Sequence, residues 1–248
     1  MEKQYVLGVD VGGQTAKCGV VNASGEVIAQ SILVSNEHTD AEGFISALAS
    51  TLKKLMKDAK VEGEVRGVGV GAPNGNYYTG EIKNAPNLTW CKEGGVEFSK
   101  MLSAEMDGMP VALTNDANAA AVGEMTYGVA RGMKDFIMIT LGTGVGSGIV
   151  IGGNVVYGHD GFAGELGHTC AVRGGRQCGC GKRGCLEAYA SAVAVARTAK
   201  EWLEARPEES SLLRFKDNVS SKDVYEAAKA GDKMAIEIFE YTGRILGE

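Results

Sequence analysis

Short apolar runs separated by glycine-containing turns open the chain. Residues 5–9, 15–21 and 27–34 each predict a strand, and because the connections are so short, these strands predict an antiparallel meander. Residues 40–60 carry apolar side chains at the three- to four-residue spacing of one helix face, and residues 65–71 form another apolar run. The expected opening order is therefore strand, strand, strand, helix, strand.

The rest of the chain repeats part of this pattern. The elements predicted next are a long polar loop over 71–90, a helix over 98–106, a short strand over 111–113, a helix over 115–128, strands over 136–141 and 148–151, and helices over 186–203, 222–230 and 233–246. The second strand–glycine turn–strand pattern matches that of residues 5–21. This indicates a duplicated α/β architecture with a cleft between two lobes, 1–113 and 114–248. Few strands follow the second glycine turn, so the second lobe is expected to be incomplete.

Composition excludes some classes of function. The chain has 248 residues, a formal net charge of −6 and 44% hydrophobic residues. This acidic balance argues against a general nucleic-acid binder, which carries a basic patch. It leaves a phosphate ligand possible, since backbone N–H groups and a metal ion can hold phosphate. No apolar run reaches the roughly 20 residues needed to span a membrane, and the first residues lead into a predicted strand without a signal region. We therefore expect a cytoplasmic protein with no membrane partner.

Three of the six cysteines lie close together, at Cys178, Cys180 and Cys185, and His168 precedes them. In a reducing compartment such a cluster indicates metal binding rather than disulfides. Three thiolates and one imidazole suit a tetrahedral structural zinc, which leaves no position open for water. The alternatives are a chance group of reduced thiols and a competing ligand at Cys170.

Asn115 and Asp116 follow a predicted strand and begin a predicted helix. Ligands often bind at such strand ends in α/β folds. The alternative is a simple N-cap, in which these side chains satisfy the first backbone N–H groups of the helix.

Two glycine turns could present backbone N–H groups to phosphate. The first spans residues 10–15 and the second residues 141–148. An ordinary hairpin is the alternative for the first, whereas the second has more glycines than a hairpin requires. Two carboxylates, Glu165 and Glu187, flank the cysteine-rich insert of about 158–187. They could be solvated surface charges, but their closeness to a rigid metal loop favours a place in a site.

In this order, and most specifically over 158–187, the segments resemble the ROK family of sugar kinases and sugar-responsive repressors. The resemblance runs from about residue 5 to residue 190. It implies the duplicated actin-like ATPase fold also found in hexokinases. It further implies ATP-dependent phosphorylation of a hexose with Mg²⁺, a structural Zn²⁺ and a homo-oligomer, a dimer or larger.

The resemblance also implies roles for individual residues. Phosphate binding falls to Asp10, Gly12, Gly13, Gln14, Thr15, Gly142, Thr143 and Gly144. Sugar binding falls to Gly75, Asn87, Asn115, Asp116, Glu165, His168 and Glu187. Asp116 would be the general base, and His168 would contact both zinc and a sugar hydroxyl. Gln14 stands where the family's first phosphate loop has Thr. Family kinases continue beyond the position of residue 248, so a truncated chain is expected.

Three other functions are alternatives to a kinase. A sugar-responsive repressor carries a helix-turn-helix domain before the first phosphate loop, and no such segment is expected here. A non-catalytic remnant that binds sugar or zinc is the second alternative. A Rossmann dehydrogenase would lead its glycine turn into a helix, whereas residues 12–13 lead into a strand. Glucose is the first expected substrate, with N-acetylmannosamine, allose, fructose and mannose as alternatives.

Overall fold

The computed structural model describes residues 4–91 and 94–248, so the first three residues, where no signal region was predicted, lie outside the described part. The chain forms two compact units. The first comprises Met1–Met138 with Gly148–Ala163, and the second comprises Ile139–Ser147 with Gly164–Glu248. This division reflects which residues pack together, and it assigns residues 114–138 to the first unit. The predicted lobes, 1–113 and 114–248, remain an expectation about the duplicated fold.

The first unit contains a five-stranded sheet with the order β3-β2-β1-β4-β5. Its strands are β1 (Tyr5–Val11), β2 (Thr15–Asn22), β3 (Val27–Val34), β4 (Val65–Ala72) and β5 (Val111–Asn115). The first three pair antiparallel, which confirms the predicted meander, and β4 and β5 join in parallel. Parallel pairing brings the carboxyl ends of β1, β4 and β5 to one edge of the sheet.

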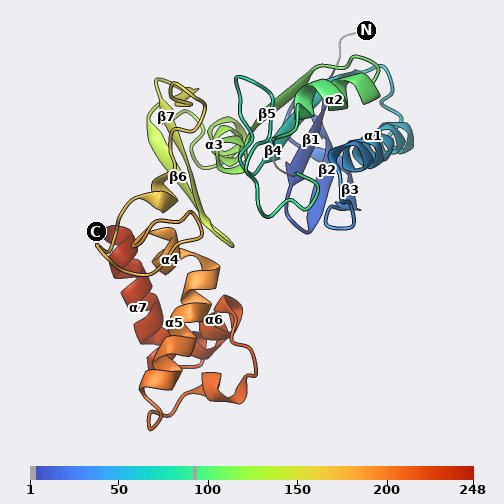
Figure 1. Cartoon of the computed structure of the whole chain (residues 1–248). Coiled ribbons are helices and arrows are strands. Elements are labelled where there is room, and N and C mark those ends of the chain that lie inside the picture. Colours follow the sequence, from blue (N-terminus) through green and yellow to red (C-terminus); the bar gives the residue numbers. More distant parts are fainter. Residues whose placement is uncertain (1–3, 92–93) are drawn as a thin grey trace. The chain divides into compact units, whose positions relative to one another are not determined.

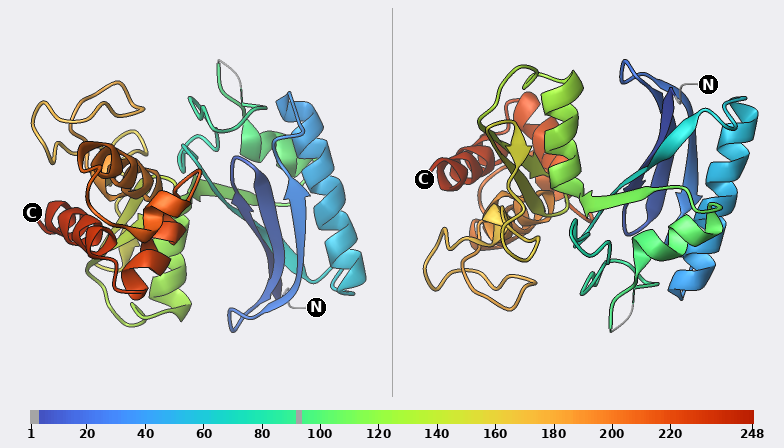
Figure 2. Two further views of the ribbon diagram at one scale, coloured as in Figure 1. Left: turned by 90° about the horizontal axis from the view of Figure 1, so that it is seen from below. Right: turned by 90° about the horizontal axis from the view of Figure 1, so that it is seen from above.

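Helices cover both faces of this sheet (Figure 1). Helices α1 (Ala41–Asp58) and α2 (Phe98–Glu105) lie on one face, and α3 (Asp116–Tyr127) lies on the other, as the further views also show (Figure 2). The α1 helix begins where the Asp40 side chain accepts a hydrogen bond from the Gly43 amide, a usual N-cap. Its apolar stripe packs beside β2, β3 and α2 in the main core, where the Phe44 and Trp90 rings stack with centroids 4.2 Å apart.

The loop from Gly71 to Trp90 is better anchored than its polar sequence indicates. Bridges pair Gly75 with Ile82 and Ile82 with Val96. Ile82, Leu88 and Trp90 are buried in the core. Burial of these side chains offsets the entropy cost of ordering the loop, so it forms a structured part of the first unit.

A second sheet has the order β6-β7-β8, and the division between the units crosses β6 and β7. Its strands are β6 (Phe136–Leu141), β7 (Val145–Ile151) and β8 (Asn154–Val155). The second unit also contains the short 3-10 helices η1 (Leu166–His168) and η2 (Leu212–Phe215), and the helices α4 (Glu187–Ala190), α5 (Ala192–Ala205), α6 (Ser221–Lys229) and α7 (Lys233–Gly247). Helices α5 to α7 pack around a small core that includes Val195, Leu213, Val224 and Ile238.

Two predicted elements differ from the structure. The single helix expected over 186–203 is two helices, because Ser191 adopts an extended backbone and caps α5 by accepting a hydrogen bond from the Ala194 amide. The neighbouring Ala192 amide donates to the Gly142 carbonyl at 2.8 Å, which ties the start of α5 to the second glycine turn. The strand expected over 148–151 begins earlier, at Val145, so that part of the glycine-rich run belongs to the strand.

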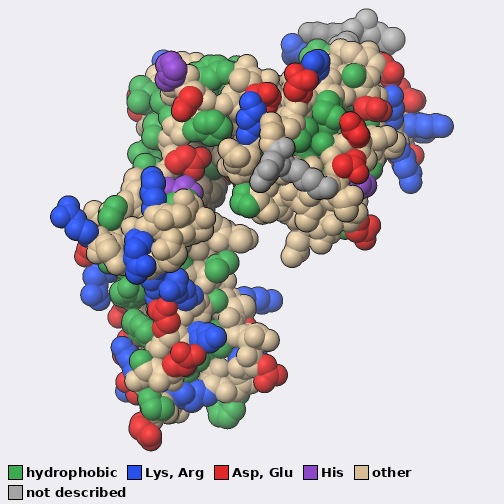
Figure 3. Space-filling view, in the orientation of Figure 1, with side chains coloured by type: hydrophobic (Ala, Val, Ile, Leu, Met, Phe, Trp, Pro, Cys, Tyr) green, Lys and Arg blue, Asp and Glu red, His purple; other side chains and the backbone are tan. Residues whose placement is uncertain are grey.

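Lys and Arg side chains are interspersed with Asp and Glu over α5 to α7 in the space-filling view (Figure 3). Among the residues that the structure describes, no helix has the length and apolar character needed to cross a bilayer.

Candidate active site

The candidate residues fall into two groups, one in each unit. In the first unit, Asp10 lies near the end of β1, opposite Lys17 of β2. The Lys17 Nζ and Asp10 Oδ2 atoms are 3.8 Å apart, and both side chains are largely exposed. An exposed pair of this kind contributes little stability. The Asp10 carboxylate is therefore accessible to a cation that prefers oxygen ligands, such as Mg²⁺.

The turn after β1 is held by its surroundings. A Cβ atom at Gly13 would lie 2.7 Å from the Asn87 carbonyl oxygen, so the close approach of these two loops requires glycine. The Gln14 carbonyl accepts a hydrogen bond from the Ser35 amide at 2.8 Å. These contacts involve the backbone of the turn and do not depend on the residue type at position 14.

Asn115 and Asp116 stand at the start of α3. Asn115 is the N-cap, because its side chain accepts a hydrogen bond from the Ala117 amide at 2.9 Å, and Asp116 Oδ1 accepts from the same amide at 2.8 Å. The N-cap interpretation is thus correct for Asn115. It does not exclude a ligand role for Asp116, which is the first residue of the helix and reaches solvent.

The carboxyl group of Asp116 has a raised pKa. Burial of the carboxyl is the main cause, the Ala117 N–H opposes it, and the negative charge of Asp10 raises the pKa further. The last effect means that the sheet edge brings Asp10 and Asp116 into one electrostatic neighbourhood. A carboxylate whose pKa is raised toward neutrality is a better proton acceptor than a free aspartate.

The loop residue Gly75 lies against the same edge. A Cβ atom there would come 2.5 Å from the Thr114 carbonyl oxygen, immediately before Asn115 in the chain. The Asn74 side chain holds the loop by donating to the Asn84 carbonyl at 2.5 Å. The first unit therefore brings together six predicted residues: Asp10, Gly13, Gly75, Asn87, Asn115 and Asp116.

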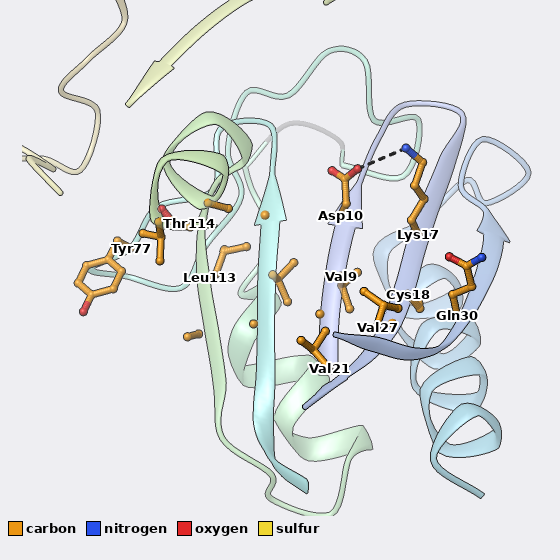
Figure 4. Close-up of a pocket in the computed structure, with 18 of the residues that line it drawn as sticks. Val9, Asp10, Lys17, Cys18, Val21, Val27, Gln30, Tyr77, Leu113 and Thr114 are labelled. Carbon is orange, nitrogen blue, oxygen red and sulfur yellow. Dashed lines mark ion pairs between the residues drawn. The ribbon is translucent and has the colours of Figure 1, made fainter. Parts of the chain in front are cut away.

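A hollow of the first unit has a volume of about 560 Å³ and lies on the sheet face opposite α1 (Figure 4). Glycines form much of its floor, because Gly8 pairs with Gly19 on one side and Gly69 on the other. Asp10 is the one predicted site residue among those that line it. The candidate sugar residues of the first unit are thus gathered at the sheet edge rather than in this hollow.

In the second unit, Glu187 holds the second glycine turn. Its Oε2 atom accepts a hydrogen bond from the Val145 amide at 3.0 Å. A Cβ atom at Gly144 would lie 2.4 Å from the same oxygen, so a side chain there would displace the Glu187 carboxylate. Thr143, Cys178 and Glu187 line a smaller hollow of about 170 Å³. The turn of residues 142–144 and the cysteine-rich insert therefore share one pocket.

His168, Cys178, Cys180 and Cys185 form a compact ligand set. Their candidate ligand atoms all lie within 4.8 Å of one another, with 3.7 Å between His168 Nδ1 and Cys178 Sγ and 3.7 Å between Cys180 Sγ and Cys185 Sγ. Tetrahedral zinc with Zn–S bonds of about 2.3 Å separates two sulfur ligands by about 3.8 Å. The set fits zinc, and Cys170 is not part of it.

The His168 ring is oriented in a way that allows a second contact. Its Nδ1 atom faces the thiols, so Nε2 is the atom that remains for another partner. A metal-bound histidine commonly uses its second nitrogen in a hydrogen bond. Burial is the main cause that raises the pKa of the Cys185 thiol to about 12 in the protein alone. A bound cation would compensate this cost by stabilising thiolates.

Glu165 and His168 occupy the two ends of η1. Glu165 precedes the 3-10 helix and His168 ends it. Ser147 anchors this turn, since its hydroxyl contacts the Gly164 carbonyl and accepts from the Leu166 amide at 3.2 Å. Sequence reasoning missed Ser147, and its position inside the glycine-rich run gave no signal of this role.

Arg176 was also missed, although it fixes the insert to the helices. Its partly buried guanidinium donates to Ala188 and Thr198 and pairs with Glu201 at 2.5 Å. Its backbone amide donates to the Tyr189 hydroxyl at 2.7 Å. The insert is thus attached to α4 and α5 by the contacts of one arginine.

The chain as a whole matches a known family. The model of the ROK family matches residues 6–248, so the chain belongs to that family. Its fold is accordingly the hexokinase-like, actin-type α/β fold expected from the sequence.

The relatives include both enzymes and regulators. The glucokinase of Halalkalibacterium halodurans is 37% identical over 252 residues, an alignment that covers 100% of this chain and 75% of that protein. A ROK glucokinase structure from Streptomyces griseus, in complex with glucose and AMPPNP, matches with a TM-score of 0.79 and 36% identity over 98% of this chain and 77% of that one. A ROK transcriptional regulator, a homologue of the E. coli MLC protein, matches with a TM-score of 0.87 and 25% identity, covering 99% of this chain and 61% of that one.

Proposed function

We propose that this ROK-family sugar kinase transfers the γ-phosphoryl group of ATP to a hydroxyl group of a hexose, with glucose as the first substrate. The observation that carries the proposal is the position of Asp116. Its carboxyl group lies at the start of α3 and has a raised pKa. The negative charge of Asp10, near the end of β1, contributes to that rise. The similar glucokinase solved with glucose and an ATP analogue supports both substrates.

In the proposed mechanism the sugar hydroxyl oxygen attacks the γ-phosphorus, and Asp116 accepts the hydroxyl proton as the new P–O bond forms. The bond between the γ-phosphorus and its bridging oxygen breaks, and ADP leaves. Such transfers depend mostly on positioning and charge stabilisation, which can lower a barrier by roughly 7–11 kcal/mol. Mg²⁺ bound to ATP would neutralise phosphate charge, and Asp10 would help to hold it.

The turns at Gly12–Gly13 and Gly142–Gly144 would donate backbone N–H groups to phosphate oxygens. Gln14 and Thr15 complete the first turn, and Thr143 the second. The close approach of Gly13 to the Asn87 carbonyl supports this assignment, since it leaves no room for a side chain in the turn.

Sugar binding would involve Gly75, Asn87 and Asn115 in the first unit and Glu165, His168 and Glu187 in the second. His168 would use Nε2 toward the sugar, because Nδ1 faces the thiols. Glu187 has a further task, since its Oε2 already accepts from Val145. Zinc held by His168, Cys178, Cys180 and Cys185 would keep this loop rigid.

A non-catalytic, regulator-like sugar-binding protein is the second candidate, favoured by the likeness to the MLC homologue. The test is ADP release by the zinc-loaded chain with Mg-ATP and a panel of glucose, N-acetylmannosamine, allose, fructose and mannose. Release that depends on one hexose supports the kinase and identifies its substrate. Hexose binding without release with any sugar would instead support the regulator-like function.

A further inference from the structure

Three tyrosines from two distant loops pack together in the first unit. Tyr77 and Tyr157 stack with ring centroids 4.2 Å apart and an interplanar angle of 3°. Tyr78 lies edge-on to both rings, with centroids 5.7 Å from Tyr77 and 6.1 Å from Tyr157. Eighty positions separate Tyr77 from Tyr157 in the chain, so the stack joins two segments that no strand pairing connects.

Polar contacts reinforce the same junction. The Tyr78 hydroxyl donates to the Gly158 carbonyl at 3.0 Å, and Asn76 Nδ2 donates to the Asp160 carbonyl at 2.6 Å. Asn76 is buried. Gly161 has a φ of +88°, and a Cβ atom there would lie 2.7 Å from Asn76 Nδ2, so this close approach depends on glycine.

The junction adds little to the main apolar core. Tyr77 and Tyr78 remain 50% and 58% exposed, and neither belongs to the core cluster. Two half-exposed rings contribute less burial than a core aromatic residue. Directional contacts therefore determine where the two loops meet. They are the parallel ring stack and the two hydrogen bonds from side chains to carbonyl groups.

Each joined segment leads directly to proposed sugar-binding residues. Gly75 precedes the tyrosine pair and packs on the Thr114 carbonyl beside Asn115. On the other segment, Gly161 is followed within a few residues by Glu165. The tyrosine clasp, defined as Asn76, Tyr77, Tyr78 and Tyr157, thus connects the loop over the sheet edge to the segment that enters the cysteine-rich insert.

We propose that the tyrosine clasp is a positioning element for hexose binding: it holds the loop of Gly75 in place and determines affinity for the sugar rather than for ATP. This inference rests on the proposed function. None of the four residues is assigned contact with a reacting atom. Their effect would pass through the backbone of the two joined segments.

The test compares Tyr157→Ala, which removes the stack, with Tyr157→Phe, which retains it. For Tyr157→Ala we expect the KM for hexose to rise about tenfold, with the KM for ATP within about twofold of the original chain. Tyr157→Phe should restore the hexose KM. The matched control is Tyr127→Ala, which removes a half-exposed tyrosine on α3 of the same unit and should leave both KM values unchanged.

Hydrogen exchange measures whether the two joined segments stabilise each other, and it does not depend on turnover. In Tyr157→Ala, amides of residues 74–82 should exchange faster together with those of 157–161. Exchange that quickens only in 157–161, or hexose and ATP KM values that rise equally, would overturn the proposal. If the original chain binds no hexose, the proposed function fails, and unchanged exchange over 74–82 would then overturn the clasp separately.

Discussion

Asp116 and His168 are both proposed to contact the sugar, yet different interactions hold them. Asp116 begins a helix at the edge of a five-stranded sheet whose opposite face packs on a core that contains Leu7, Phe44 and Trp90. His168 ends a three-residue 3-10 helix in an insert whose buried residues include Cys178 and Cys185 rather than large aliphatic side chains. Burial of apolar side chains stabilises the sheet that carries the first position. The contacts of Arg176 hold the second, and zinc on the proposed ligands would stabilise it further.

This difference teaches how each half of the site can fail. A sheet and its helices survive the loss of one surface contact, because many buried groups share the stabilisation. A loop stabilised by four metal ligands loses its structure when one ligand is removed, since metal affinity is then part of its folding free energy. The two halves should therefore respond to different perturbations.

The largest expected effect separates chemistry from structure in the first unit. Asp116→Asn should lower kcat by about 10³-fold, because it removes the proposed general base, while hexose binding stays within about threefold. Steady-state ADP release and calorimetric binding measure the two quantities. Asp107→Asn is the control, since Asp107 has a φ of +57° that asparagine tolerates. Undiminished turnover in Asp116→Asn would remove Asp116 from this role.

The next effect tests the stabilisation of the first unit by its core. Phe44→Ala should lower the free energy of unfolding of that unit by about 3–5 kcal/mol, because a fully buried ring that stacks on Trp90 is lost. The chain has two tryptophans, Trp90 in the first unit and Trp202 in the second, so their fluorescence reports each unit in turn. The zinc content should not change. A parallel loss of zinc would show that the units are not independently stabilised.

A smaller effect concerns the ligand set of the second unit. Cys180→Ala should abolish stoichiometric zinc and destabilise residues 166–187 by about 3 kcal/mol, with little change around Trp90. Metal analysis and hydrogen exchange measure both. The matched control is Cys170→Ala, another exposed cysteine that lies outside the ligand set. Zinc loss in the Cys170 variant would mean that the wrong cysteine was chosen.

The smallest effect is a pH dependence that belongs to the first unit alone. The pKa of Asp116 is raised in the folded protein, mainly by burial, so its ionised form is less favourable there than in the unfolded chain. The protonated Asp116 contributes its full stability below about pH 4, the ordinary pKa of aspartate in the unfolded chain. That contribution is lost as the pH rises through the higher pKa of the folded protein. Asp116→Asn should therefore raise the unfolding temperature slightly at pH 7.

That gain should disappear below about pH 4, where Asp116 is protonated in both folded and unfolded states. Turnover should show the opposite trend, falling as pH drops through the raised pKa, because the base must be ionised. A stability gain that is equal at pH 7 and pH 4 would contradict the assigned cause. Scanning calorimetry across this range makes the comparison.

Much of the first unit could be predicted from the sequence because its signals are local. The meander follows from short glycine turns, and α1 follows from apolar spacing and its Asp40 cap. The break at Ser191 was missed, although Ser191 caps α5 locally; the hydrogen bond from Ala192 to Gly142 that accompanies the break joins residues far apart in the chain. The anchoring of the Gly71–Trp90 loop was missed because it too involves residues far apart in the chain, such as Phe44 and Trp90.

For the site, the sequence by itself determined the chemistry that is available: a carboxylate at a strand end, glycine turns, and three cysteines with one histidine. Residue types and spacing near one another in the chain carry that information. Only the tertiary structure decided that Asp10 influences Asp116, that Asn87 presses on Gly13, and that Tyr77 stacks on Tyr157. Such contacts depend on how separate segments pack, and packing geometry at long sequence separation has no local pattern to reveal it.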